Sequence, residues 1–172
     1  MCLWLAVAGV PAVHAVPSTP LPAAVLEAEP ALALVGKSRF RKFLIHVYDA
    51  RLWAPAGDYR PDAVVALDLT YARAFESDAL ATRSVQEMAG IGAGSEAQRA
   101  QWAEQMREVF PDVAQGDRLI GLYEPGGASR FYLNGKLYSQ VDDPAFGEAF
   151  FGIWLNEATS EPALREALIA QR

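Results

Sequence analysis

The chain has 172 residues, of which 52% are hydrophobic and 21% charged, and this composition suits a single compact domain with a full core. The net charge is −6 at pH 7 and no cluster of Lys and Arg is visible, so the sequence argues against nucleic acid as a partner and disfavours anionic membrane surfaces. The single cysteine, Cys2, lies in the first fifteen residues. Removal of that segment would leave no thiol for disulfides, thiol catalysis or cysteine-based metal sites.

Residues 1–15 resemble the remainder of a secretory signal. They carry no charge and end in Val13-His14-Ala15, with small residues at the two positions that signal peptidase reads. The apolar run is too short to span a bilayer as a helix, and it lacks a basic first region. We expect cleavage after Ala15 and a periplasmic or secreted location; a buried N-terminal strand or helix is the alternative. Residues 16–30 are then a Pro- and Ala-rich leader that packs loosely, followed by one domain over residues 31–172.

The hydrophobic periodicity predicts strands and helices in alternating groups. Strand-like runs rich in β-branched and aromatic residues come first and return after two helices. Ser77 and Ser95 are expected to cap those two helices, and Asn134-Gly135 supplies the left-handed positions of a type I′ turn between the last strands. The expected strands are 31–41, 43–53, 63–71, 117–124, 131–133 and 136–141, and the expected helices are 79–89, 96–110, 145–155 and 163–172.

The order of these elements is βββ αα βββ αα, which predicts an α+β fold and not the single alternation of parallel α/β proteins. The helix at 145–155 is apolar almost all round, so we expect it to be buried. Asp142 or Asp143 with Pro144 begins this helix, and Ser160 with Pro162 begins the last one.

The sequence offers little catalytic apparatus. His14 and His46 are the only histidines, so a two-histidine metal site cannot form once residues 1–15 are removed, and no serine lies in a nucleophile elbow. His46 is more simply a strand histidine bound to a neighbour. Asp49 and Arg51 share a face of one strand and suit a surface ion pair. We therefore expect no metal and no cofactor.

Arg39, Arg41 and Tyr48 are the candidates for ligand binding, because a guanidinium beside a phenol suits a carboxylate. The hairpin register decides whether they meet. A four-residue loop would place Arg39 opposite Tyr48 and Arg41 opposite His46, whereas a three-residue loop would place both arginines on the other face from Tyr48. The alternative is that both arginines are half-exposed residues that shield a sheet edge.

A series of stretches carries a family resemblance through its order and spacing: "GKSRFRKFLIHVYDARLW", "RSVQEM", "FPDVAQGDRLIGLYEPGG", "RFYLNG" and "DPAFGEAFFGIWLNEATSEPALREALI". Together they cover nearly all of residues 33–169. They resemble the chalcone isomerase family, in particular its bacterial chalcone-isomerase-like, non-catalytic branch. The resemblance implies an open-faced β-sandwich, in which helices pack on one face of an antiparallel sheet and a ligand cleft lies between them.

The resemblance also bears on catalysis. The catalytic members use an arginine on the first strand and a threonine on the second. Their positions fall at Arg39 or Arg41 and at Tyr48. Their helix tyrosine and asparagine fall near Leu80 and Glu87, and their late hydroxyl falls where this chain has Phe150 and Phe151. Only the arginine matches, and loss of the other groups removes most of the electrostatic stabilisation of the reaction. We expect that the chain is not a working chalcone isomerase.

The fatty-acid-binding branch instead holds a ligand carboxylate with a first-strand arginine and a second-strand tyrosine. By this resemblance Arg39 or Arg41, with Tyr48, would bind a small apolar acid in a cleft between sheet and helices. Two other hypotheses stay open: an isomerase or lyase acting on a periplasmic substrate with Tyr48 or His46 as acid or base, and an envelope structural or interaction protein. In the last case the cleft would be filled by Trp102, Phe150, Phe151 and Trp154, for which core packing is the expected role.

Overall fold

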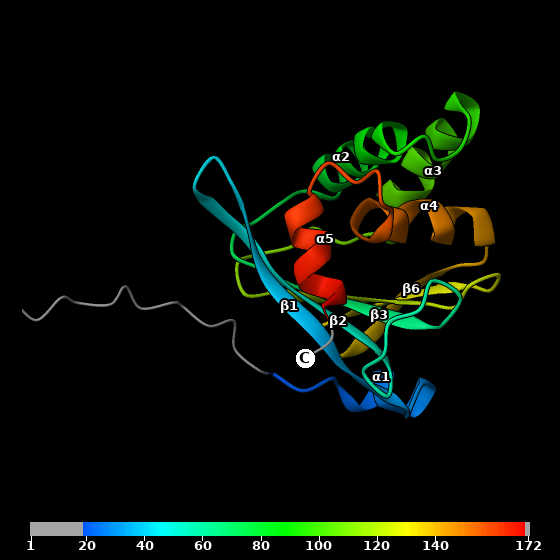
Figure 1. Cartoon of the computed structure of the whole chain (residues 1–172). Helices are drawn as coiled ribbons and strands as arrows, with labels where there is room; N and C mark the ends of the chain where they lie inside the picture. Colours follow the sequence, from blue (N-terminus) through cyan, green and yellow to red (C-terminus); the bar gives the residue numbers. More distant parts are fainter. Residues whose placement is uncertain (1–18, 171–172) are drawn as a thin grey trace, which may run out of the picture.

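The computed structural model describes residues 19–170, and its centre is one antiparallel sheet of six strands. The strands follow one another in the sheet in the same order as along the chain, which confirms the expected α+β class (Figure 1). They are β1 (Leu32–Lys42), β2 (Ile45–Pro55), β3 (Val65–Tyr71), β4 (Arg118–Tyr123), β5 (Ser129–Leu133) and β6 (Lys136–Val141).

Four helices cover one face of the sheet, and a short helix that the sequence did not predict lies on the other (Figure 1). The short helix is α1 (Ala23–Ala28), and the four are α2 (Ser77–Gly90), α3 (Glu96–Val109), α4 (Pro144–Leu155) and α5 (Pro162–Ile169). The helices interlock the two halves of the chain. Helix α5 from the second half contacts β1 and β2 of the first, and α3 from the first half contacts β6 of the second. Among residues 19–170 no helix is both long enough and apolar enough to cross a membrane.

Local sequence signals explain several of these boundaries. Ser95 caps α3 in a capping box with Gln98, as predicted. Asp143 caps α4 by accepting a hydrogen bond from the amide of Ala145 at 2.9 Å. The other two predicted caps are wrong: Ser77 and Ser160 lie next to the cap positions, and neither side chain caps its helix.

The main core lies between the sheet and the four helices. Helix α4 places Phe146, Phe150 and Phe151 there, so the prediction that this helix is buried is confirmed. A smaller cluster on the opposite face contains Leu21 and Val25, which are both buried. Residues 19–30 therefore do not pack loosely as expected, because these two apolar side chains anchor them to the sheet. Residues 1–15, with Cys2 and His14, and residues 16–18 lie outside the described part of the chain.

The face of the sheet that carries α1 also holds a buried charge network. Asp68 is fully buried and accepts two hydrogen bonds from Arg118, at 2.9 and 2.7 Å, while Arg51 lies 3.5 Å from the same carboxylate. Arg118 also donates to the carbonyl of Pro20 at 2.9 Å, which links β4 to the segment before α1. The expected surface pairing of Asp49 with Arg51 is wrong in that both side chains are buried and have partners on other strands.

The β1–β2 hairpin is longer than the rest of the sheet, and its turn projects from the body of the molecule (Figure 1). Phe43 and Leu44 form a two-residue turn with φ of +48° and +67°, the left-handed values that a type I′ turn requires. The loop is thus shorter than either length considered from sequence. Because the loop has an even number of residues, Arg41 lies opposite His46, as predicted for a loop of even length.

One extra residue in β2 then changes the register. The bulge at Val47 shifts the pairing, so Phe40 and not Arg39 lies opposite Tyr48. Arg39 lies opposite Asp49. The pairing of Arg39 with Tyr48 that a four-residue loop would give is therefore absent, and the two side chains lie on opposite faces of the sheet, as the other alternative had it for Arg39.

Gly36 lies where the backbone of α5 packs closely against β1. A Cβ at this position would lie 2.3 Å from the carbonyl oxygen of Ala167 and 2.5 Å from that of Leu168, and backbone atoms cannot move aside cheaply. We expect Gly36→Ala to lower the free energy of unfolding by about 1–3 kcal/mol, measured by urea denaturation. Gly90→Ala is the matched control, since no atom lies within 4 Å of its added Cβ, and it should leave stability unchanged or slightly higher. Equal effects of the two substitutions would contradict the close packing.

Candidate functional site

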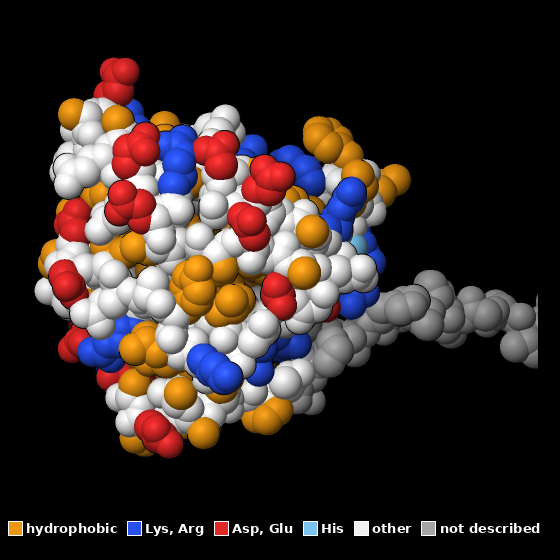
Figure 2. All heavy atoms as spheres, turned by 180° about the vertical axis from the view of Figure 1, so that it is seen from behind, with side chains coloured by type: hydrophobic (Ala, Val, Ile, Leu, Met, Phe, Trp, Pro, Cys, Tyr) orange, Lys and Arg blue, Asp and Glu red, His pale blue; other side chains and the backbone are white. Residues whose placement is uncertain are grey.

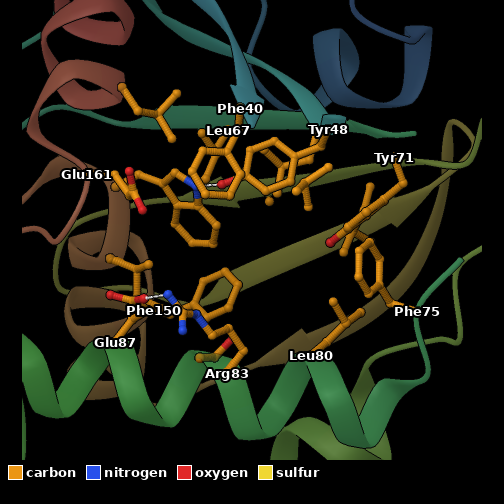
Figure 3. A pocket seen from close by; sticks show the side chains of 18 of the residues that line it. Phe40, Tyr48, Leu67, Tyr71, Phe75, Leu80, Arg83, Glu87, Phe150 and Glu161 are labelled. Atoms are coloured by element: carbon orange, nitrogen blue, oxygen red, sulfur yellow. Dashed lines mark hydrogen bonds and ion pairs between the residues drawn. The ribbon is translucent and has the colours of Figure 1, made fainter. Parts of the chain in front are cut away.

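A cavity of about 460 Å³ lies between the sheet and the helices. Strands supply one wall, α2 the opposite wall, and α4 with the start of α5 closes the side (Figure 3). The lining side chains are mainly aliphatic and aromatic, and its most deeply buried members include Leu67, Leu69, Tyr71, Phe110, Phe131, Phe150 and Phe151. The cleft is therefore not filled by the aromatic residues of α4, which leave room for a ligand.

Helix α2 contributes its lining at regular helical spacing. Ala79, Leu80, Arg83, Ser84 and Glu87 all face the cavity, and their positions, i, i+1, i+4, i+5 and i+8, form one stripe of the helix. The stripe begins apolar and becomes polar toward the end of the helix. The cavity therefore has an apolar end near β3 and a polar end near Glu87.

Two phenol groups point into the cavity, as Figure 3 shows. The hydroxyl of Tyr48 accepts a hydrogen bond from the indole nitrogen of Trp154 at 3.0 Å, and its own hydrogen stays available for donation. The ring of Tyr71 packs edge-on against Tyr48, with centroids 6.2 Å apart. Among residues 19–170 the hydroxyl of Tyr71 has no hydrogen-bond partner, so it can bond to a polar atom of a ligand.

The charged residues of the lining form two ion pairs whose cations are exposed, and we call this exposed end of the cavity the mouth. On one side Arg83 pairs with Glu87, which also accepts a hydrogen bond from the hydroxyl of Ser160 at 2.7 Å. On the other side Lys42 pairs with Glu161 at 2.6 Å. These pairs connect α2, the turn before α5 and the β1–β2 hairpin around the mouth. Lys42 and Arg83 are half exposed, so their charges stay solvated.

Of the three residues that the sequence singles out for ligand binding, only Tyr48 lines the cavity. Arg39 lies on the opposite face, where it donates to Asp49 at 2.8 Å, and Arg41 is exposed near the hairpin turn. His46 also contacts Asp49, at 3.0 Å, as expected of a strand histidine bound to a neighbour. Burial would raise the pKa of Asp49, but the hydrogen bonds and charges of Arg39 and His46 outweigh it and lower that pKa.

Most positions matched to the catalytic residues of the family lie around the cavity. Leu80, Glu87, Phe150 and Phe151 line it, whereas Arg39 and Arg41, which match the catalytic arginine, do not. The side chains of these four lining residues offer one carboxylate, which is shared by Arg83 and Ser160, and no hydroxyl or amide. Among residues 19–170 no group of three or more metal-ligating side chains comes together.

Sequence reasoning missed Lys42, Tyr71, Arg83 and Trp154 as site residues. The signal that could have found Arg83 is its position on α2, where a charged residue falls on the same stripe as Leu80 and Ala79. No comparable signal exists for Tyr71, which alternates normally with buried residues in β3 and reads as a core tyrosine.

Comparison with known proteins places this geometry in context. A model of the chalcone isomerase-like family matches residues 15–170. An uncharacterized protein of Haemophilus influenzae is 25% identical over 140 residues, which cover 80% of this chain and 67% of that protein. Among solved structures, a fatty-acid binding protein of Arabidopsis thaliana is similar, with a TM-score of 0.65 and 11% identity over 81% of this chain and 87% of that one. At this identity the structural likeness concerns the fold.

The buried phenols predict how the protein responds to alkaline pH. Burial raises the pKa of both Tyr48 and Tyr71, because the phenolate would lose its hydration, and the hydrogen bond from Trp154 offsets this only partly for Tyr48. Unfolded tyrosine ionises at about pH 10, so the contribution of these two phenols to the free energy of unfolding should be constant below that pH and fall above it. Alkaline titration of tyrosinate absorbance should show a fraction that appears only on unfolding. That fraction should be smaller by two tyrosines in Tyr48→Phe/Tyr71→Phe; an unchanged fraction would contradict the assignment.

Proposed function

Because the chain belongs to the chalcone isomerase-like family, we propose that it is a non-catalytic binding protein for a small apolar acid, similar to a fatty acid. The observation that carries this proposal is the cavity itself. Its volume, about 460 Å³, lies in the range of about 300–1,000 Å³ that is usual for small-molecule sites. Its walls are apolar, and its cations are confined to the mouth.

The apolar walls favour a hydrocarbon body over a polar ligand. A polar ligand would lose its hydrogen bonds to water against Leu67, Leu69 and Phe131, and these side chains offer none in return. An alkyl chain has no such cost, and its burial is favourable by roughly 25 cal/mol for each Å² removed from water. Inside the cavity the hydroxyls of Tyr71 and Tyr48 are the phenol groups that can donate a hydrogen bond to a ligand atom.

The mouth favours an acidic head group. Arg83 and Lys42 are the cations of the lining, and each shares its charge with a glutamate, Glu87 or Glu161. A ligand carboxylate at the mouth would join these pairs and accept hydrogen bonds from the arginine. Arg83 and Lys42 thus take the role that the sequence assigned to Arg39 and Arg41. The fatty-acid binding protein of similar fold supports the same class of ligand.

The phenols favour binding over catalysis. With raised pKa values, Tyr48 and Tyr71 stay protonated near neutral pH and act as hydrogen-bond donors, not as bases. Glu87, the nearest carboxylate on α2, is engaged with Arg83 and Ser160. Glu161, the other carboxylate of the lining, is paired with Lys42, so among residues 19–170 each carboxylate that lines the cavity already has a cationic partner.

Blocking the cavity is the direct test. We expect Leu80→Trp, which adds an indole on the α2 wall, to weaken binding of lauric acid more than tenfold by titration calorimetry. Thr82→Trp is the matched control, since Thr82 is exposed on the same helix and does not line the cavity, and it should bind as the unaltered chain does. Unchanged binding by a folded Leu80→Trp protein would exclude the cavity as the site.

The charges at the mouth make a second prediction, which has opposite signs for two neighbouring residues. Arg83→Gln should weaken lauric acid binding about fivefold, whereas Glu87→Gln should strengthen it by a few-fold, because Arg83 then no longer shares its charge. Dodecanol, which has the same alkyl chain without the carboxylate, should bind the unaltered chain and both variants with equal affinity. Equal losses for acid and alcohol would show that the substitutions act on packing and not on the head group.

We also propose that the protein is exported, on the basis of the uncharged, apolar residues 1–15 and the small residues before position 16. Expression of the full chain in a Gram-negative host should yield a periplasmic protein whose first residue is Val16, by N-terminal sequencing. Retention of Met1 on the mature protein would contradict cleavage at this position.

A further inference from the structure

The turn of the β1–β2 hairpin is unusually apolar for a surface loop. Phe43 is 88% exposed and Leu44 is 93% exposed, and Ile45 beside them is also exposed. All three lie at the turn between β1 and β2, the part of the hairpin that projects from the molecule (Figure 1). Scattered apolar residues are common on surfaces, but three consecutive ones at a projecting tip form a patch that marks a contact site.

The backbone makes this tip more unusual. Both turn residues adopt left-handed φ values, which bulky side chains rarely take and which Asn and Gly accept easily. The same chain uses Asn134-Gly135, with φ of +49° and +83°, at its other tight hairpin. Phe43 and Leu44 are thus unfavourable both for solvation and for turn geometry. Stability of the fold therefore does not explain why these two residue types occur at the turn.

Cationic residues lie near the tip. Arg41 and Lys42 precede it in β1, and Arg73 is exposed in the segment beside the hairpin, where the amide of Ala72 donates to the carbonyl of Val47, three residues after the turn, at 2.9 Å. Neither Arg41 nor Arg73 makes an ion pair with any residue in the described range 19–170. Figure 2 shows Lys and Arg side chains below the apolar protrusion, whereas most acidic side chains on this face lie farther from it.

We propose that this tip docks the protein on a bilayer that contains anionic lipids. An apolar tip inserted at the level of the head groups, ringed by cations that contact lipid phosphates, is the pattern of an interfacial membrane anchor. The net charge of −6 disfavours anionic surfaces for the chain as a whole. Local charge decides the contact, however, because charges farther away than about 10 Å are screened at physiological salt.

The tip and the mouth of the cavity are adjacent. Phe43 and Lys42 belong both to the hairpin end and to the cavity lining. A docked tip therefore brings the mouth close to the membrane surface, where apolar acids partition. Docking itself does not depend on the proposed ligand; this last step rests on the proposed function.

The test is flotation of the full chain with vesicles. The vesicles contain equal parts of phosphatidylglycerol and phosphatidylcholine, or phosphatidylcholine alone. We expect stronger binding to the anionic vesicles and weaker binding as salt is raised. Hydrogen–deuterium exchange should show protection of residues 41–46 when anionic vesicles are added. Protection elsewhere without protection of these residues would overturn the proposal, and so would equal binding to both vesicle types. The same holds if the chain binds another protein through the tip but does not bind vesicles.

Phe43→Asn/Leu44→Gly is the decisive variant, because it removes the apolar tip and installs the dipeptide that this turn prefers. It should lose at least tenfold in affinity for anionic vesicles while its melting temperature stays equal or rises.

Arg41→Gln should lose about fivefold in affinity for the same vesicles, in line with the roughly 1 kcal/mol that one cation contributes at an anionic surface. Leu137→Ser/Tyr138→Ser is the matched control, since this pair on β6 is 59% and 50% exposed and far from the hairpin in sequence, and it should bind as the unaltered chain does. Lauric acid binding measured on Arg41→Gln, whose residue does not line the cavity, separates failure of docking from failure of the cavity proposal.

Discussion

The extra residue at Val47 is the constraint on which the arrangement of the site depends. Side chains alternate between the faces of a strand, so one added residue moves everything on one side of it to the other face. It places Tyr48 and Phe40 together over the helices, with their rings 4.9 Å apart, and sends Arg39 with Asp49 to the opposite face. Without the bulge an arginine would lie opposite Tyr48, beside a cavity whose walls are otherwise apolar.

The result is a sheet with chemically distinct faces. Toward α1, Arg51, Asp68 and Arg118 form a buried network in which each charge has an opposite partner. Such a network is costly to bury and is tolerated only when its hydrogen bonds are made, here by the bidentate contact of Arg118. Toward the helices, the strands present leucines and aromatic rings. Among the described residues that line the cavity, the cations are Lys42 and Arg83, which lie at the mouth and stay in contact with water.

Sequence reasoning succeeded where local chemistry decides structure. The turn at Asn134-Gly135, the helix cap at Ser95 and the apolar helix at α4 were predicted because each signal lies within a few residues. It failed where the partner is distant. Helix α1 is only six residues long, and its anchor, Val25, packs on a sheet built from the rest of the chain. The bulge has no signature in the hairpin sequence, so the faces of Arg39 and Tyr48 could not be assigned, and Arg83 became a site residue only once α2 was placed over the sheet.

The interlocked helices have a consequence for folding. Each half of the chain is a three-stranded meander followed by two helices, and residues 72–117 separate β3 from β4. Helix α5 completes the packing of the first half and α3 that of the second, so each half exposes apolar surface until the other is present. Neither half is then a stable unit on its own, and closing the long connection is the entropically costly step. The chain should therefore fold and unfold as one cooperative unit, and the cavity, which both halves line, exists only in the fully folded molecule.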